Sequence, residues 1–498
     1  MAAIITEKFR QHNATQFFES FTEASASTYY LFVGKATAYT SGTTGGSDSS
    51  PPTPSDSPSD TEFYAWDSML AAKNVTSSDV TFSIPRRNWV NGTTYDMYDD
   101  NISSSNTTTS GASNLYDSTF YFMTSDYRVY KVLDNNAGTA YSGAEPTSES
   151  TSPFALGGYV LKYMYQITTS EAAKYLTSDF IPVSDDSTVS AAATDGKIES
   201  LKVTAGTGYT NGTYYAAVYG DGTSAGTSSG AIVRITVSGG TIQSFGLTAG
   251  TDTTIHAGGA GYTFGTVNLA SGYTFSDSSL SSASAIGGTG GSIEVVISPK
   301  NGHGNSAVTE LGGHFVMTAT TLTQAENDDI TTANDFRQVG LVVDPTNYGT
   351  STVASASTRR QTFVVKASSV SGTFEVDEKI TQATTGAVGK VVEFDSTNQL
   401  LYFQQERFGD FGTNSTTGDH SVFEGTNVIT GATSSATFTP SSSSETITLA
   451  NNNTITTSSG YVNPELQPDS GNIVYLENRK PIQRDSDQTE DIKLIIEF

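Results

Sequence analysis

The last seven residues of the chain alternate in character, and this pattern constrains the fold more than any other. Residues 492–498 read IKLIIEF, with apolar side chains at every second position, as in a strand with one buried face. A second apolar run, Ile473–Leu476, lies upstream and stops at Asn478–Pro481. Because proline has no N–H for a ladder, we expect the first strand to end there, Ile482–Gln488 to turn, and the two strands to pair as a closing hairpin. Earlier segments must complete its sheet.

Composition favours strands in the rest of the chain. Only 15% of residues are charged, and the chain contains 47 Gly, 25 Tyr and 25 Phe, a mixture typical of strands and turns. At 498 residues the chain is too long for one core. The expected fold is mainly β and multi-domain, a β-sandwich or two-layer β core with few short helices.

Charge excludes some partners. Acids outnumber bases by 51 to 25, a formal charge of −26, so nucleic acid and anionic membrane surfaces are poor partners and a basic protein surface fits better. With no cysteine, neither disulfides nor thiolate metal sites are possible. The N-terminus has no signal-peptide pattern and no apolar run reaches the length of a membrane span. We therefore expect an intracellular product with no membrane insertion.

Several elements follow from local patterns. We expect an opening strand at Ile4–Phe9, a strand covered on both faces at Tyr29–Gly34, and a strand at Gly157–Ile167 with Tyr159, Leu161, Tyr163, Tyr165 and Ile167 on one face. Further strands are expected around Tyr121 and at Tyr127–Leu133, Phe180–Val183, Phe315–Met317, Val388–Phe394 and Leu400–Gln404, the last two forming a hairpin. Short helices are expected at Gln16–Ala24, Thr61–Lys73 and Thr169–Leu176, the last capped by Thr169 or Ser170, and an exposed loop at Ser41–Asp60.

Two segments carry internal repeats. Ile198–Gly206 recurs as Ile242–Gly250, and Gly208–Thr213 recurs as Gly261–Thr266, which predicts a small all-β module. In a second segment, Phe374 and Ile380 recur at the same spacing as Phe423 and Ile429. The tyrosines of the first module could stack on sugars if exposed; the preferred interpretation is that they pack small sheets that lack larger cores.

No pattern typical of catalysis is present. The sequence has no nucleophile elbow, phosphate-binding loop or zinc-protease motif, and only five histidines. The acid pairs Asp99–Asp100, Asp185–Asp186 and Asp328–Asp329 lie in polar turns, where carboxylates are usually solvated. His303 and His314 beside Glu310 lack a third ligand at reliable spacing, and a calcium loop at Asp221–Gly222 is equally weak. We expect no enzyme activity, no cofactor and no metal.

Four islands resemble one family in the same order along the chain. They are IPRRNW at Ile84–Trp89, GYVLKYMYQI at Gly158–Ile167, NDFRQVGLVVDP at Asn334–Pro345, and Gly471–Phe498 with its YLENR, PI and DQTE strings. These resemble the dimeric baseplate wedge subunit of T-even-type contractile-tailed bacteriophages. The residues that we expect in structural or interface roles are Arg86, Arg87, Trp89, Phe336, Arg337, Tyr475, Glu477, Asn478 and Arg479.

The resemblance implies a domain plan. Residues 1–194, 298–361 and 451–498 would form the wedge-subunit core, and 195–297 and 362–450 would be two inserted β modules without counterparts in the family pattern.

The resemblance also implies a function. The chain would be a virion protein of the tail baseplate, assembled in the host bacterial cytoplasm, that forms a homodimer, binds other wedge proteins and takes part in baseplate rearrangement on contraction. The alternative is a tail adhesin that recognises host surface glycans through the β insertions.

Overall fold

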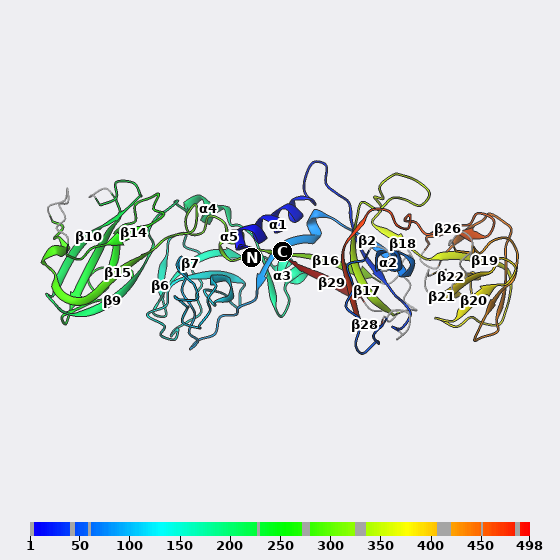
Figure 1. Cartoon of the computed structure of the whole chain (residues 1–498), viewed down its shortest axis with the longest axis horizontal. Helices are drawn as coiled ribbons and strands as arrows, with labels where there is room; N and C mark the ends of the chain where they lie inside the picture. The colour runs from blue at the N-terminus through cyan, green and yellow to red at the C-terminus, as the bar shows by residue number, and fades with distance from the viewer. Residues whose placement is uncertain are drawn as a thin grey trace. The chain divides into compact units, whose positions relative to one another are not determined.

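The computed structural model describes residues 4–39, 45–57, 61–226, 230–270, 279–323, 335–405, 420–449, 452–483 and 489–498. It divides into two compact units, one of Met1–Phe18, Thr81–Met317 and Ile495–Phe498 and one of Glu19–Val80 and Thr318–Leu494. Strands hold 42% of the residues and helices 10%, which confirms the mainly β prediction (Figure 1).

The second unit contains a five-stranded antiparallel sheet. Its order is β18 (Thr358–Arg360), β2 (Met69–Val75), β1 (Tyr29–Gly34), β17 (Phe336–Val343) and β28 (Asn472–Ile482). All six residues of β1 are buried, as predicted for an apolar run covered on both faces. Tyr30, Phe32 and Val342 pack with Trp66 in the core on this sheet.

The same unit holds a closed β barrel. Its strands are β22 (Leu400–Gln404), β21 (Ala387–Asp395), β20 (Lys379–Gln382), β23 (Ile429–Gly431), β24 (Thr437–Pro440) and β19 (Phe363–Ser371), with β27 (Tyr461–Val462) beside β19. Pairing of β19 with β22 closes the ring. The β21–β22 hairpin is confirmed. The two repeated segments lie next to each other, since β20 pairs with β23, and Phe374 and Phe423 both enter the barrel core.

In the first unit, a four-stranded sheet has the order β4 (Tyr121–Met123), β5 (Arg128–Asp134), β7 (Tyr159–Gln166) and β6 (Phe154–Leu156). One prediction about β7 is wrong. Tyr159, Leu161 and Tyr163 share one core cluster, whereas Tyr165 belongs to another. The register between β5 and β7 shifts between Val129 and Tyr130, and such a bulge redirects the side chains beyond it.

The residues of the first repeat form a second sheet in this unit. Its order is β12 (Thr241–Ile242), β11 (Ile232–Ser238), β10 (Gly212–Gly220), β14 (Gly265–Val267), β15 (Gly287–Val296) and β9 (Ser200–Tyr209), with β13 (Thr254–Ala257) on β11. Tyr209 and Tyr262 are buried in its core, as the packing interpretation predicts. Glycines make room for them: a Cβ at Gly222 would lie 2.3 Å from the Tyr262 ring.

The predicted closing hairpin is wrong. β28 lies at the end of the five-stranded sheet, whereas β29 (Thr489–Glu497) belongs to a four-stranded sheet with the order β29, β16 (Phe315–Thr323), β3 (Val80–Pro85) and β8 (Phe180–Val183). The first strand also continues through Pro481, because β28 is an edge strand and a missing N–H is tolerated at an edge. The remaining strands, β25 (Thr446–Thr448) and β26 (Thr454–Thr456), form a small ribbon.

Four local predictions also change: the opening strand at Ile4–Phe9 and the helices at Gln16–Ala24, Thr61–Lys73 and Thr169–Leu176. The N-terminus forms helix α1 (Glu7–Glu19) rather than a strand, and the Thr6 hydroxyl accepts a hydrogen bond from Phe9 N in its first turn. Helix α2 ends early (Phe63–Ser68) because Met69–Val75 pairs with β1. The cap of α3 (Thr169–Tyr175) is Thr168, in a capping box with Glu171.

The other helices are α4 (Ser187–Ala192), α5 (Ala307–Glu310) and the 3-10 turns η2 (Ser77–Asp79), η3 (Leu115–Asp117) and η4 (Ala283–Ala285). Parts of the predicted loop at 41–60, the acid pair Asp328–Asp329 and the start of the island at Asn334 lie outside the described residues.

Candidate interface and structural sites

The IPRRNW island connects the end of β3 to three other segments. Arg86 donates from its backbone N to Asp179 O and from Nη1 to Thr177 O, both at 2.7 Å, and from Nε to Asn88 Oδ1 at 2.9 Å. Arg87 Nη2 donates to Tyr116 O at 2.8 Å. These half-buried arginines therefore donate hydrogen bonds to backbone carbonyls that strand pairing leaves without a donor.

Arg87 also stacks on an aromatic ring. Its guanidinium carbon lies 4.8 Å from the centroid of Tyr121, within cation–π range. Burial raises the pKa of Tyr121, so its phenol stays protonated at neutral pH and donates to Pro85 O at 2.6 Å. The Nη1 atom of Arg87 is buried without a hydrogen-bond partner.

Trp89 extends this attachment. Its backbone N donates to Met123 O at 2.8 Å, and its ring meets Tyr141 edge-on with centroids 5.8 Å apart. The indole Nε1 is also buried without a partner. Arg86, Arg87 and Trp89 thus make contacts within the first unit.

Phe336 and Arg337 open strand β17. Phe336 is 1% exposed. Arg337 forms a bidentate pair with Asp48, Nε to Oδ1 and Nη2 to Oδ2 at 3.0 Å each, and donates from Nη1 to Ala36 O. Tyr39 OH donates to Arg337 O at 2.6 Å. Arg337 therefore attaches the segment after β1 to the sheet.

Tyr475–Arg479 lies in β28, the last strand of its sheet in the part of the chain that the structure describes. The Tyr475 hydroxyl donates to Glu477 Oε2 at 2.9 Å, and Arg479 Nη1 lies 3.3 Å from Glu477 Oε1. Burial, with the Glu477 carboxylate second, raises the pKa of Tyr475 to about 12. Asn478 donates to Pro52 O at 2.9 Å and accepts from Gln338 Nε2 at 2.9 Å. Among the described residues β28 pairs with β17 alone, so its other edge has no strand partner.

The histidine cluster has a different composition from the one considered as a metal site. His303 Nδ1 and Glu310 Oε2 both contact the fully buried Lys131 ammonium, at 2.9 and 2.7 Å, and that ammonium lies 3.9 Å from the Tyr98 ring centroid. Burial, with Lys131 second, lowers the pKa of His303 well below its usual value, so the ring is neutral. His314 instead lies 3.3 Å from Glu7.

Sequence reasoning missed this buried ion pair. Its signal was a lysine inside the apolar run YRVYKVL, since a lysine in a fully buried strand needs a counter-charge. Burial lowers the pKa of Lys131, and Glu310 opposes that shift. Within the described ranges, no group of three or more His, Cys, Asp or Glu residues could hold a metal ion. No helix in those ranges is long and apolar enough to cross a membrane.

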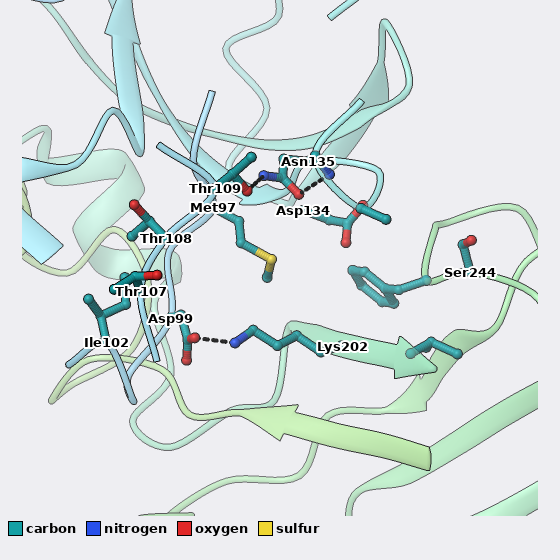
Figure 2. A pocket seen from close by; sticks show the side chains of 14 residues that line it. Met97, Asp99, Ile102, Thr107, Thr108, Thr109, Asp134, Asn135, Lys202 and Ser244 are labelled. Atoms are coloured by element: carbon teal, nitrogen blue, oxygen red, sulfur yellow. Dashed lines mark hydrogen bonds and ion pairs between the residues drawn. The ribbon is translucent and has the colours of Figure 1, made fainter. Parts of the chain in front are cut away.

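Figure 2 shows a pocket of about 240 Å³ in the first unit. Its wall comes from segments 97–109, 134–138, 202–203 and 244–245. The Asp99–Lys202 ion pair lies at one side, and the Asp134 carboxyl and the Met97 side chain point toward the central space. The Asn135 side chain donates to Thr109 Oγ1 at 3.1 Å and accepts from Gly138 N at 3.0 Å.

A larger pocket of about 490 Å³ lies in the second unit. Tyr348, Phe363 and Tyr461 line it with half-buried or exposed rings. Both ring nitrogens of His420, another lining residue, are buried without a hydrogen-bond partner, and Nε2 lies 3.9 Å from Asp67. Aromatic rings and polar groups together suit a sugar.

Comparison with known families gives a match at both ends of the chain. The family model described as Bacteriophage T4, Gp8 matches residues 3–146 and 442–498, which include the IPRRNW island and all of β28 and β29. Residues 147–441 lie outside the match, and no curated protein matches the chain. Over these two stretches the chain is therefore similar to the bacteriophage T4 Gp8 family, which supports a structural baseplate-wedge subunit of the phage tail.

Proposed function

We propose that this chain is a wedge subunit without catalytic activity that forms a homodimer and binds neighbouring baseplate proteins. Similarity to this family supports association with other baseplate proteins. The formal charge of −26 favours neighbours with basic surfaces, since opposite charges speed and orient association.

The edge of β28 carries the homodimer proposal. β28 has 11 residues, is paired only with β17 in the described chain, and includes Val474, which is 49% exposed. A long edge strand offers unpaired N–H and C=O groups to another strand. Two copies that pair through this edge would form an isologous interface, the commonest kind in homodimers.

The sequence of β28 is self-complementary in one register. If two β28 strands pair antiparallel with Asn478 opposite Asn478, each Glu477 faces the other copy's Arg479. Directly opposed charges of unlike sign stabilise a strand pair, and like charges destabilise it. Both side chains are accessible, with 37% and 48% of their surfaces exposed.

A charge swap tests this interface. Arg479→Glu would place like charges opposite each other, so we expect self-association at least tenfold weaker, measured by sedimentation equilibrium against the 52.4 kDa chain mass. Glu477→Arg combined with Arg479→Glu should restore the dimer. The matched control Lys480→Glu makes the same charge change opposite the apolar Leu476 and should remain dimeric. An Arg479→Glu protein that dimerises like wild type contradicts pairing through β28.

We also propose that residues 195–297 and 362–450 are insertions carried by the wedge-subunit core. In support, 200–296 and 363–440 each supply strands of one sheet with its own apolar core, and nearly all of both segments lies outside the family match. Participation in rearrangement on contraction and assembly in the host cytoplasm rest on the family alone.

Glycan recognition is the second candidate function, and the aromatic pocket lined by Tyr348, Phe363 and Tyr461 favours it. The tyrosines first considered, Tyr209 and Tyr262, do not support it because they are buried. A glycan array with the full chain tests this candidate: selective binding that Tyr348→Ala removes supports it, and an array without binding contradicts it.

A further inference from the structure

One carboxyl group in the pocket of Figure 2 has no counter-charge. Asp134 is 8% exposed, and it accepts one hydrogen bond, from Asn136 N at 2.9 Å to Oδ1. Among the described residues, no ion pair includes Asp134, and the pocket's one cation, Lys202, is paired with Asp99. Buried carboxylates are ordinarily paired or fully hydrogen-bonded. Asp134 departs from this rule, because the free side of its carboxyl group faces the pocket without a partner (Figure 2).

The wall beside Asp134 is held in an unusual backbone conformation. Asn136 and Ala137 have φ values of 51° and 52°, followed by Gly138 at 78°. A left-handed alanine is uncommon and costs about 1 kcal/mol or more. Asn135 stabilises this turn from both sides, through Thr109 and Gly138 N. Such strain concentrates at ligand sites, and here it shapes the pocket.

The rest of the pocket is apolar enough to cover a hydrocarbon stem. Met97, Val203 and Phe245 line it, and Phe245 is 7% exposed. A volume of about 240 Å³ is many times the ~10–15 Å³ that one water molecule needs. A short aliphatic chain therefore fits between the side chains and the carboxyl group.

We propose that this pocket binds an alkylammonium group, with the Asp134 carboxylate accepting the ammonium and Met97 and Phe245 covering the methylenes. The proposal does not depend on the wedge function. A divalent metal ion fits less well, because no cluster of three ligand side chains occurs in the described residues. An anion would meet the unpaired carboxylate.

Binding should depend on pH. Burial raises the pKa of Asp134 to about 6, so a cation must compete with a proton. The other charged groups on the pocket wall, Asp99 and Lys202, are paired with each other. Affinity should therefore rise about tenfold from pH 5 to pH 7 and then level off.

The test is calorimetric titration of the full chain with n-butylammonium at pH 7.5, with n-butanol as the uncharged probe of equal stem length. We expect saturable millimolar binding of the amine and none of the alcohol. Asp134→Asn should weaken amine binding at least tenfold. Asp377→Asn is the matched control, because burial also raises the pKa of Asp377 but that residue belongs to the other unit, and it should bind like wild type.

Two further titrations distinguish the source of the group. Binding of Nα-acetyl-lysine methylamide favours a lysine side chain of a neighbouring protein, whereas binding of 1,4-diaminobutane without that of the lysine probe favours a free diamine. A wild-type chain that does not bind n-butylammonium, or an Asp134→Asn chain that binds it equally well, overturns the proposal. Dimer formation is measured in a separate experiment, so a chain that stays monomeric would not change the interpretation of amine binding.

Discussion

Arg337 and Asp48 form a bidentate ion pair between strand β17 and a segment with no regular secondary structure. The two N–O distances are 3.0 Å, and the Arg337 side chain is 7% exposed. Asp48 Oδ1 also accepts from Tyr39 N at 3.0 Å. A planar fork that meets both carboxylate oxygens fixes direction as well as distance, so this pair determines how Asp48 lies against the sheet.

Removal of Asp48 should leave the buried Arg337 guanidinium without its bidentate partner, although Asp335 Oδ2 remains 3.6 Å from Nη2. We expect Asp48→Ala to lower the free energy of unfolding by about 1–3 kcal/mol, less than for a fully buried pair because the carboxylate is one-third exposed. Arg337 lowers the pKa of Asp48, so this stabilisation is present above pH 4 and disappears as the pH falls through the lowered pKa. Urea unfolding at pH 7 and pH 3 measures both effects. Asp56→Ala, at an exposed aspartate, is the control, and an equal loss in both variants would exclude the pair as the cause.

Asp134 should have the opposite pH dependence. Burial raises its pKa to about 6, so the contribution of this group to stability is greatest when the carboxyl is protonated and decreases as the pH rises from about 4 to 6. Asp134→Asn should therefore increase the free energy of unfolding by about 2–3 kcal/mol at pH 7.5 and hardly change it at pH 3.5. Urea titrations at the two pH values check this. A variant less stable than wild type at pH 7.5 would show that the ionised group is already compensated.

Two substitutions at Trp89 separate the contribution of ring packing to stability from that of hydrogen bonding. Trp89→Ala should cost about 2–4 kcal/mol because it removes the edge-on contact with Tyr141. Trp89→Phe keeps an aromatic ring and removes the unpartnered N–H, so it should cost less than about 1.5 kcal/mol. Chemical unfolding compares the two. Equal losses would mean that Nε1 has a partner, and a Trp89→Ala chain that joins wedges at wild-type yield would contradict a role for this residue in assembly.

The packing of Tyr262 should make the stability of the 200–296 module sensitive to a methyl group added at Gly222. Gly222→Ala places a Cβ 2.3 Å from the ring, and the resulting overpacking should cost about 1–3 kcal/mol. Gly239→Ala is the control, since its added Cβ meets no atom within 4 Å and only its φ of 63° is strained. Thermal unfolding followed by tyrosine fluorescence reports on both. A Gly222→Ala chain as stable as wild type would contradict the close packing of Tyr262 on this glycine.

Apolar runs predicted strands well where burial alone decides the structure. YYLFVG became β1 and LLYFQ became β22, each buried along its whole length, because a residue covered on both faces has few alternatives to a sheet. The Glu171 carboxylate and Thr168 hydroxyl also formed the capping box that their spacing permits, although the sequence interpretation placed the cap one or two residues later.

Pairing between distant segments could not be predicted in the same way. The partner of β28 is β17, more than a hundred residues earlier, and local patterns around Pro481 carry no information about that register. The interface residues show a similar limit. The NDFRQ island indicated that Arg337 is important. Its partner Asp48 could not be predicted, because it lies in a Ser/Gly-rich segment whose composition indicates only a loop.

The account depends most directly on whether the chain enters a wedge as a pair of copies. Native mass measurement of the purified 52.4 kDa chain mixed with the other tail components tests this, with the Arg479→Glu chain in parallel. We predict a complex that contains two wild-type copies joined to at least one other baseplate protein, and loss of the second copy with Arg479→Glu. A wild-type chain that stays monomeric and joins none of the components would contradict the account.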